Sequence, residues 1–154
     1  MITRILLAVD DSPAALAAAR LALDLAARLP ARIRALSVVA SHSLNDALAL
    51  QSGYSDLPAR REAAGTSVLD YIAELARQAG LELETRQLGG EPARHILTEA
   101  REWPADLIVI GKSGGRQLGE PYVGSQTSHV LEFADRPVLV VPPPGRELRS
   151  GDTP

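Results

Sequence analysis

The chain has 154 residues, a length typical of one domain, and its composition excludes several classes of protein. A net charge of −3 without a long basic run argues against a dedicated nucleic-acid-binding domain, and an aromatic content of 3% leaves few rings to stack on bases. The absence of cysteine excludes disulfides, thiolate metal sites and cysteine nucleophiles. No apolar run is long enough to span a membrane and no signal peptide is recognisable, so we expect a soluble cytoplasmic protein.

The N-terminal part predicts a strand followed by a helix. The apolar run 4–9 indicates a buried strand, and Ser12 and Pro13 are typical of a helix start, with Ser12 as N-cap and Pro13 in the first helical position. Residues 14–29 are almost entirely Ala and Leu, which predicts a helix packed closely on a sheet. The polar residues of this helix are four apart and form one solvent-facing stripe: Arg20, Asp24 and Arg28.

The rest of the chain continues this alternation. The expected elements are a strand over 32–40, a connecting loop over 41–57 with at most one helical turn at 45–50, a helix over 60–79, a strand over 81–88, a turn over 89–92, a helix that ends at 103–104, a strand over 106–110, a helix over 125–134 and a strand over 138–141. Regular alternation of apolar strands with helices predicts an α/β fold with a parallel sheet covered on both faces.

Three strand ends are expected to meet in one crevice. Asp10 follows the first strand, Val38 lies near the end of the second, and a glycine-rich loop follows Ile110. In open parallel sheets, ligands bind outside the carboxyl ends of the strands, where the strand order reverses. The sequence therefore places a candidate ligand site at this end of the sheet.

The glycine-rich segment 111–125 carries the most specific functional pattern. Two residues separate Gly111 from Gly114, nine separate Gly114 from Gly124, and Ser125 follows at the predicted helix start. Glycines let the backbone approach a ligand closely, and the free N–H groups of a helix N-terminus favour phosphate. Neither the P-loop pattern nor the dinucleotide-binding glycine pattern after the first strand is present.

This glycine spacing resembles the nucleotide-binding signature of the universal stress protein family, and specifically of its ATP-binding branch. The resemblance extends from the opening Ile-Leu-Leu-Ala-Val-Asp, through Gly-Glu-Pro and Ala-Asp-Leu-Ile-Val-Ile-Gly, to the closing Arg-Pro-Val-Leu-Val-Val-Pro. It implies an open five-stranded parallel sheet of order 3-2-1-4-5 with helices on both faces, a Rossmann-like arrangement. It also implies one domain over 1–144, and the composition of 145–154 predicts a disordered tail.

The resemblance further implies a pose for an adenine nucleotide. Asp10 would face the adenine and ribose, the backbone of Val38 would read the adenine edge, and Gly114 would approach the phosphates. Ala8 would lie in the pocket wall, with Ile110 and Gly111 beneath the ribose. The segment expected to wrap the phosphates consists of Gly124, Ser125, Gln126 and Thr127, whose hydroxyls could donate hydrogen bonds.

Some of these residues also have ordinary structural explanations. Asp10 could be a helix-capping or turn carboxylate, since Asp11-Ser12-Pro13 follows it. Lys112 and Arg116 could add phosphate contacts or could be solvated loop charges. The three histidines, which are His42, His95 and His129, lack metal-ligand spacing.

The leading hypothesis is a regulatory stress-response protein that is not an enzyme and that holds ATP, together with magnesium, as a homodimer. The final strand, 138–141, is expected at the sheet edge, and the resemblance suggests that it pairs with its copy across a two-fold axis. Two alternatives stay open: a slow ATP-hydrolysing or nucleotidyl-transfer enzyme on the same fold, and an interaction protein that binds no nucleotide.

Overall fold

The computed structural model describes residues 1–40, 56–112 and 123–145 of the chain, and one parallel sheet organises them. The elements are β1 (Arg4–Val9), α1 (Pro13–Arg28), β2 (Arg32–Ala40), α3 (Leu57–Gln78), β3 (Leu83–Gly90), α4 (Pro92–Glu102), β4 (Leu107–Gly111), α5 (Ser125–Phe133) and β5 (Val138–Val141). The strand order is β3-β2-β1-β4-β5, and every neighbouring pair is parallel. The predicted fold and strand order are confirmed.

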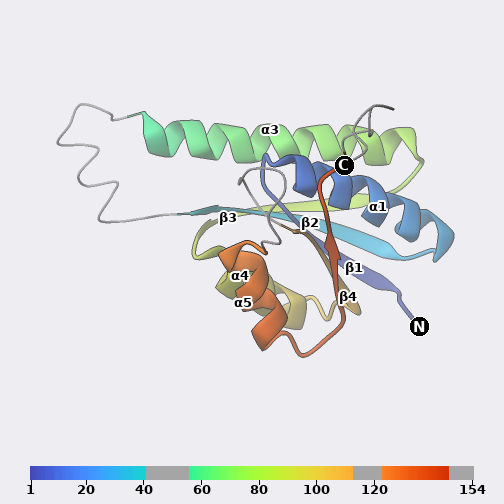
Figure 1. Ribbon diagram of the computed structural model, residues 1–154. Coiled ribbons are helices and arrows are strands. Elements are labelled where there is room, and N and C mark those ends of the chain that lie inside the picture. The colour runs from blue at the N-terminus through green and yellow to red at the C-terminus, as the bar shows by residue number, and fades with distance from the viewer. Residues whose placement is uncertain (41–55, 113–122, 146–154) are drawn as a thin grey trace, which may run out of the picture.

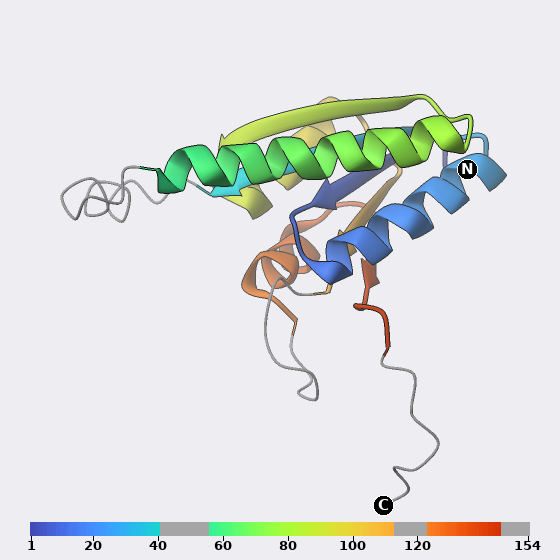
Figure 2. The same ribbon diagram turned by 90° about the horizontal axis from the view of Figure 1, so that it is seen from above.

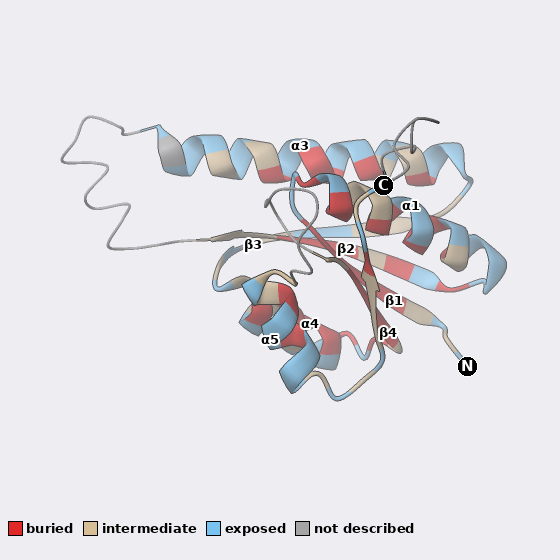
Figure 3. Cartoon of the chain, in the orientation of Figure 1, coloured by how far each residue is buried: buried red, intermediate tan, exposed pale blue. Residues whose placement is uncertain are grey.

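Of the helices in the described part of the chain, two cover each face of the sheet. Figure 1 shows α1 and α3 on one face and α4 and α5 on the other, and Figure 2 shows α1 and α3 lying across the same face. The side chains of β1 pack into both layers, because Ile5 and Leu7 belong to the α1–α3 core and Leu6 to the α4–α5 core. All three are fully buried, and Figure 3 shows the buried residues gathered on the strands and on the inward helix faces. Within the described part of the chain, no helix is both long and apolar enough to cross a bilayer.

Several predicted boundaries were wrong by a few residues. The third strand runs to Gly90 and not to Leu88, since Gly89 and Gly90 pair with the last two residues of β2 and form no turn. Gly90 has a φ of +136°, a conformation that the sequence does not distinguish from a turn glycine. Helix α3 begins three residues earlier than predicted, at Leu57, with a proline in its first turn. The possible turn at 45–50 and most of the predicted tail lie outside the described residues.

Helix α1 has the predicted start and packs closely on the sheet. The Ser12 hydroxyl accepts a hydrogen bond of 3.1 Å from the Ala15 amide, which confirms it as N-cap. The small residues of α1 let its first turn approach the end of β4. A Cβ added to Gly111 would lie 2.8 Å from the carbonyl carbon of Ala14 and 2.9 Å from the amide nitrogen of Ala15. Gly111 is therefore required for packing, whatever it does for a ligand.

Asp106 was predicted to open the fourth strand, but it lies just before β4 and joins β4 to β1. Its Oδ2 accepts hydrogen bonds from the Thr3 amide at 2.8 Å, the Thr3 hydroxyl at 2.9 Å and the Arg4 amide at 3.0 Å. These bonds, the Thr3 amide bond above all, hold the pKa of Asp106 below its ordinary value. A carboxylate near the start of β4 thus holds the start of β1 in register.

Asp106→Ala is expected to lower the free energy of unfolding at neutral pH and to weaken its dependence on acid. Because the folded-state pKa is depressed, the stabilisation is present above the unfolded pKa of about 3.9 and is lost as the pH falls through the folded-state value. Urea unfolding at about pH 7 and about pH 3 measures both effects. Asp70→Ala, on the exposed side of α3, is the control. An equal acid dependence in wild type and Asp106→Ala would contradict the assignment.

Candidate functional site

The site lies at the carboxyl ends of the strands, where the strand order reverses. From β1 the chain crosses to β2 and β3 on one side and later to β4 and β5 on the other, so β1 is the switch point. The β1–β2 pairing ends at Val9 and Ser37, whereas the β2–β3 pairing continues to Ala40. Residues 38–40 therefore extend past the end of β1 and border an open crevice.

A cavity of about 510 Å³ occupies this crevice. The residues that line it are Ala8, Val9, Asp10, Ser12, Ala15, Leu36, Val38, Ala40, Pro92, Ile96, Ile110, Gly111, Gly124, Ser125, Gln126 and Thr127. Nine of the ten predicted site residues are among them, and the tenth, Gly114, lies outside the described residues. Segments that are far apart in the sequence thus meet around one cavity, as expected from the strand ends.

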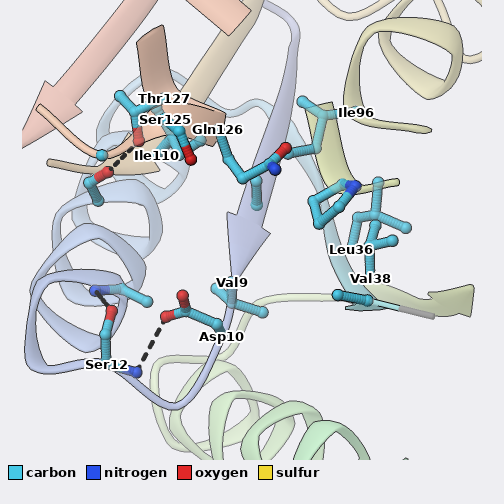
Figure 4. Close-up of a pocket in the computed structure, with 16 residues that line it drawn as sticks. Val9, Asp10, Ser12, Leu36, Val38, Ile96, Ile110, Ser125, Gln126 and Thr127 are labelled. Carbon is cyan, nitrogen blue, oxygen red and sulfur yellow. Dashed lines mark hydrogen bonds between the residues drawn. The ribbon is translucent and has the colours of Figure 1, made fainter. Parts of the chain in front are cut away.

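The cavity has an apolar side and a polar side. Figure 4 shows Leu36, Val38 and Ile96 together on one side of it. Asp10 and Ser12 lie on a second side, and the first turn of α5 with Ser125 lies opposite them. An apolar surface facing a few polar groups is the usual composition of a small-molecule site.

Three of the described helices begin at or beside this cavity. They differ in which side chains accept hydrogen bonds from the free N–H groups of the first turn. Helix α1 is capped by the Ser12 hydroxyl. Helix α4 is capped by the Glu91 carboxylate, which accepts from the Arg94 amide at 3.1 Å, and by Gln126, whose Oε1 accepts from the Ala93 amide at 2.9 Å. Helix α5 has Gly124 as N-cap and makes no side-chain capping bond. Among the described residues, its N-terminus is therefore the one of the three without a side-chain cap, and its amides suit an anion.

Three polar groups of the 124–127 segment have hydrogen-bond partners within the protein. The Thr127 hydroxyl donates to the Gly111 carbonyl at 2.9 Å, and the Gly124 amide donates to the Lys112 carbonyl at 3.0 Å. The Gln126 side chain is bonded to α4. These bonds fix the first turn of α5 against β4 and α4. The groups that remain to donate hydrogen bonds to a ligand are the Ser125 hydroxyl and the amides in the first turn of α5. The sequence does not show these bonds, because the partners lie 12 to 33 positions away in the chain.

Asp10 makes the turn contact considered for it and also lies at the cavity. Its Oδ1 accepts a hydrogen bond of 2.9 Å from the Ser12 amide, which is the turn contact that its neighbours in sequence predict. Its side chain also lines the cavity and is exposed. The turn therefore holds the Asp10 carboxylate at the edge of the site, and the bond to the Ser12 amide uses only Oδ1 and not Oδ2.

Sequence reasoning missed part of the apolar wall. Leu36 follows from the period of two along β2, because it shares a sheet face with Val38. Pro92 and Ile96 have no such signal, since only the packing of α4 on the sheet brings them to the cavity. Lys112 does not line the described cavity, and Arg116 and His42 lie outside the described residues. Within the described ranges, no cluster of His, Cys, Asp or Glu side chains suited to a metal is found.

Comparison with known proteins places the chain in a family. The model of the universal stress protein family matches residues 1–142. The chain is 32% identical to the universal stress protein YxiE of Bacillus subtilis over 148 residues, which cover 92% of this chain and 99% of that protein. It is 31% identical to the universal stress protein MJ0531 of Methanocaldococcus jannaschii over 144 residues, which cover 94% of this chain and 84% of that protein.

Solved structures share the fold. UspA of Lactobacillus plantarum superposes with a TM-score of 0.71 at 29% identity, covering 91% of this chain and 97% of that one. A universal stress protein in complex with cAMP gives a TM-score of 0.70 at 23% identity, covering 93% and 99% of the two chains. An Arabidopsis thaliana family member with AMP bound gives 0.69 at 20% identity, covering 97% of each chain. The family match over residues 1–142, together with the two relatives above 30% identity, shows that the chain belongs to the universal stress protein family.

Proposed function

We propose that this protein binds an adenine nucleotide, with ATP as the resident ligand, in the cavity between β1, β2, β4 and α5. The observation that carries the proposal is that one cavity has an apolar wall on one side and, on another, the N-terminus of α5, which has no side-chain cap. The wall suits a flat base, and the amides of α5 suit a phosphate chain.

The dimensions and chemistry of the cavity fit such a ligand. Its volume of about 510 Å³ is within the range of roughly 300–1,000 Å³ typical of small-molecule pockets. Asp10, at the rim, suits ribose hydroxyl donors. The two related structures that contain cAMP and AMP support an adenine nucleotide as the ligand class.

Magnesium belongs to the proposal as a companion of the phosphates. This ion keeps several of its waters and usually binds through one or two carboxylates plus substrate phosphates. Among the residues that line the described cavity, Asp10 is the carboxylate. We therefore expect phosphate oxygens of the nucleotide to be most of the magnesium ligands other than water.

We further propose that the protein regulates by nucleotide occupancy and is not an enzyme. Asp10 is the only titratable side chain among the described lining residues, and its Oδ1 is held by the Ser12 amide. No second base is positioned there to orient an attacking water. ATP turnover well above about one per minute would favour the enzyme alternative instead. A cytoplasmic location is part of the same proposal.

The direct test is to identify what the purified protein carries. Mass spectrometry of small molecules released on denaturation is expected to detect ATP, and calorimetry of the emptied protein is expected to show saturable binding of ATP. Titrations with ADP, AMP and cAMP then show how the binding affinity depends on the number and form of the phosphate groups. Absence of any released nucleotide, together with no heat of binding, would support the interaction-protein alternative.

We propose that the protein is a homodimer joined through β5. The carbonyls of Pro137 and Val141 accept from Ile108 at 3.0 Å and Lys112 at 2.8 Å, so these residues direct their backbone groups toward β4. Because the backbone direction alternates along a strand, Val138 and Val140 direct theirs toward the outer edge. That edge is available for a second copy of the strand.

Val140→Pro is expected to convert a dimer into a monomer of 16.3 kDa. Proline removes an outward N–H but leaves the bonds to β4 in place. Val140→Thr keeps the N–H and serves as the matched control. Sedimentation velocity measures the mass, and circular dichroism checks the fold. A Val140→Pro protein that still sediments as a dimer would contradict the β5 interface.

A further inference from the structure

A hydrogen bond joins the two helices α4 and α5, which both contribute residues to the lining of the cavity. The Oε1 atom of Gln126, in the first turn of α5, accepts from the Ala93 amide, in the first turn of α4, at 2.9 Å. Figure 4 shows the Gln126 side chain extending from α5 toward Ile96. The bond lies at the junction of the two sides of the cavity, because α5 carries the amides for an anion and α4 carries part of the apolar wall.

The rest of α4 is fixed to the sheet independently of Gln126. Glu99, one turn after Ile96, is 2% exposed and bonds Arg34 and Arg86 at 2.6 Å each. Arg34 in turn lies 4.6 Å above the Trp103 ring. The helix is therefore held on β2 and β3 by its C-terminal half. Its first turn, which contains Pro92 and precedes Ile96, is tied to α5 through the Gln126–Ala93 bond, in addition to the apolar core that the two helices share.

We propose that Gln126 is a positioning residue that couples the two ends of the nucleotide site. An anion bound by the first-turn amides of α5 orders that turn, and Gln126 passes the ordering to the first turn of α4 and to the apolar wall. This inference rests on the proposed nucleotide binding. It adds that the phosphate end and the base end of the site bind cooperatively, through one side-chain carbonyl.

The test uses adenosine and inorganic phosphate as separate probes of the two ends. Calorimetry measures adenosine affinity with and without saturating phosphate, and the ratio of the two affinities is the coupling. For wild type we expect phosphate to raise adenosine affinity about fivefold or more. Gln126→Met keeps the length but lacks the acceptor, so its ratio should fall close to one. Gln126→Glu keeps an acceptor for Ala93 and should retain the ratio, although its charge weakens phosphate binding itself.

Glu132→Gln, at an exposed position further along α5, is the matched control and should behave as wild type. Hydrogen exchange of the ligand-free proteins provides a readout without nucleotide: the Ala93 amide should exchange faster in Gln126→Met and not in Gln126→Glu. A wild-type ratio of one, or an unchanged ratio in Gln126→Met, overturns the inference but leaves the nucleotide site standing. If wild type binds neither adenosine nor ATP, the proposed function itself is overturned.

Discussion

Glu99→Ala is expected to cause the largest loss of stability of any single substitution considered, about 3 kcal/mol or more in the free energy of unfolding. The Glu99 side chain is 2% exposed and makes ion pairs with Arg34 and Arg86, both at 2.6 Å. Alanine would leave the guanidinium of Arg34, whose side chain is 17% exposed, with Glu84 as its one remaining carboxylate. The loss of one of the two carboxylates that compensate this partly buried charge is the main source of the expected cost.

The surroundings of Arg34 allow this explanation to be separated from simple loss of packing. Its guanidinium also lies over Trp103, and its pKa is raised, because its bonds to Glu84 and Glu99 outweigh desolvation, which by itself lowers the pKa. Removing both charges in Glu99→Leu/Arg34→Met leaves no buried ion without a partner. Arg86 loses Glu99 but its side chain is 44% exposed, and Glu84 keeps its pair with Arg32. We therefore expect the double variant to be more stable than Glu99→Ala, as for other buried pairs replaced by apolar residues.

Urea unfolding at neutral pH, with wild type, Glu99→Ala, Glu99→Gln and the double variant, measures these differences. Glu99→Gln retains the size and one acceptor and should lose less than Glu99→Ala. Glu74→Ala, on the exposed face of α3, removes the surface pair with Arg77 and is the control; its loss should be small. If Glu99→Ala were no worse than Glu74→Ala, the buried cluster would not stabilise α4 on the sheet.

Gly124→Val is expected to weaken ATP binding by at least about a hundredfold while leaving the fold intact. Gly124 lines the cavity as N-cap of α5, and its φ of −55° and ψ of 151° are open to any residue. Valine therefore keeps the backbone path but adds a branched side chain beside the first-turn amides. Loss of two hydrogen bonds to phosphate, at roughly 1.5–3 kcal/mol each, accounts for the expected change.

A second glycine variant separates the loss of binding from the loss of packing. Gly111→Ala should destabilise the protein as well as weaken binding, because its Cβ would meet the backbone of Ala14 at 2.8 Å. Calorimetric titration with ATP and thermal unfolding are measured for wild type and both variants, with Glu132→Ala as the control. Equal ATP affinity in wild type and Gly124→Val would refute the assignment of the α5 N-terminus to the phosphates.

Local sequence patterns determined the elements and the direction of the sheet. The apolar run before Asp10 identified the central strand, and Ser12 with Pro13 identified the start of α1, since caps and strand periodicity depend on residues a few positions apart. The rule that ligands bind at strand carboxyl ends predicted where the cavity lies, and the family resemblance supplied the nine described site residues that line it. The order of strands came from the family resemblance and not from periodicity.

Tertiary structure alone decided which polar groups face the cavity. The Thr127 hydroxyl bonds Gly111, Gln126 bonds Ala93, and Glu99 bonds Arg34, pairs that lie 16, 33 and 65 positions apart in the chain. No local pattern identifies such partners, because a hydrogen bond is fixed by distance in space, and one sequence does not record which distant residues packing brings together. The same packing brought Pro92 and Ile96 to the site. It also placed there the N-terminus of α5, whose N-cap makes no side-chain hydrogen bond.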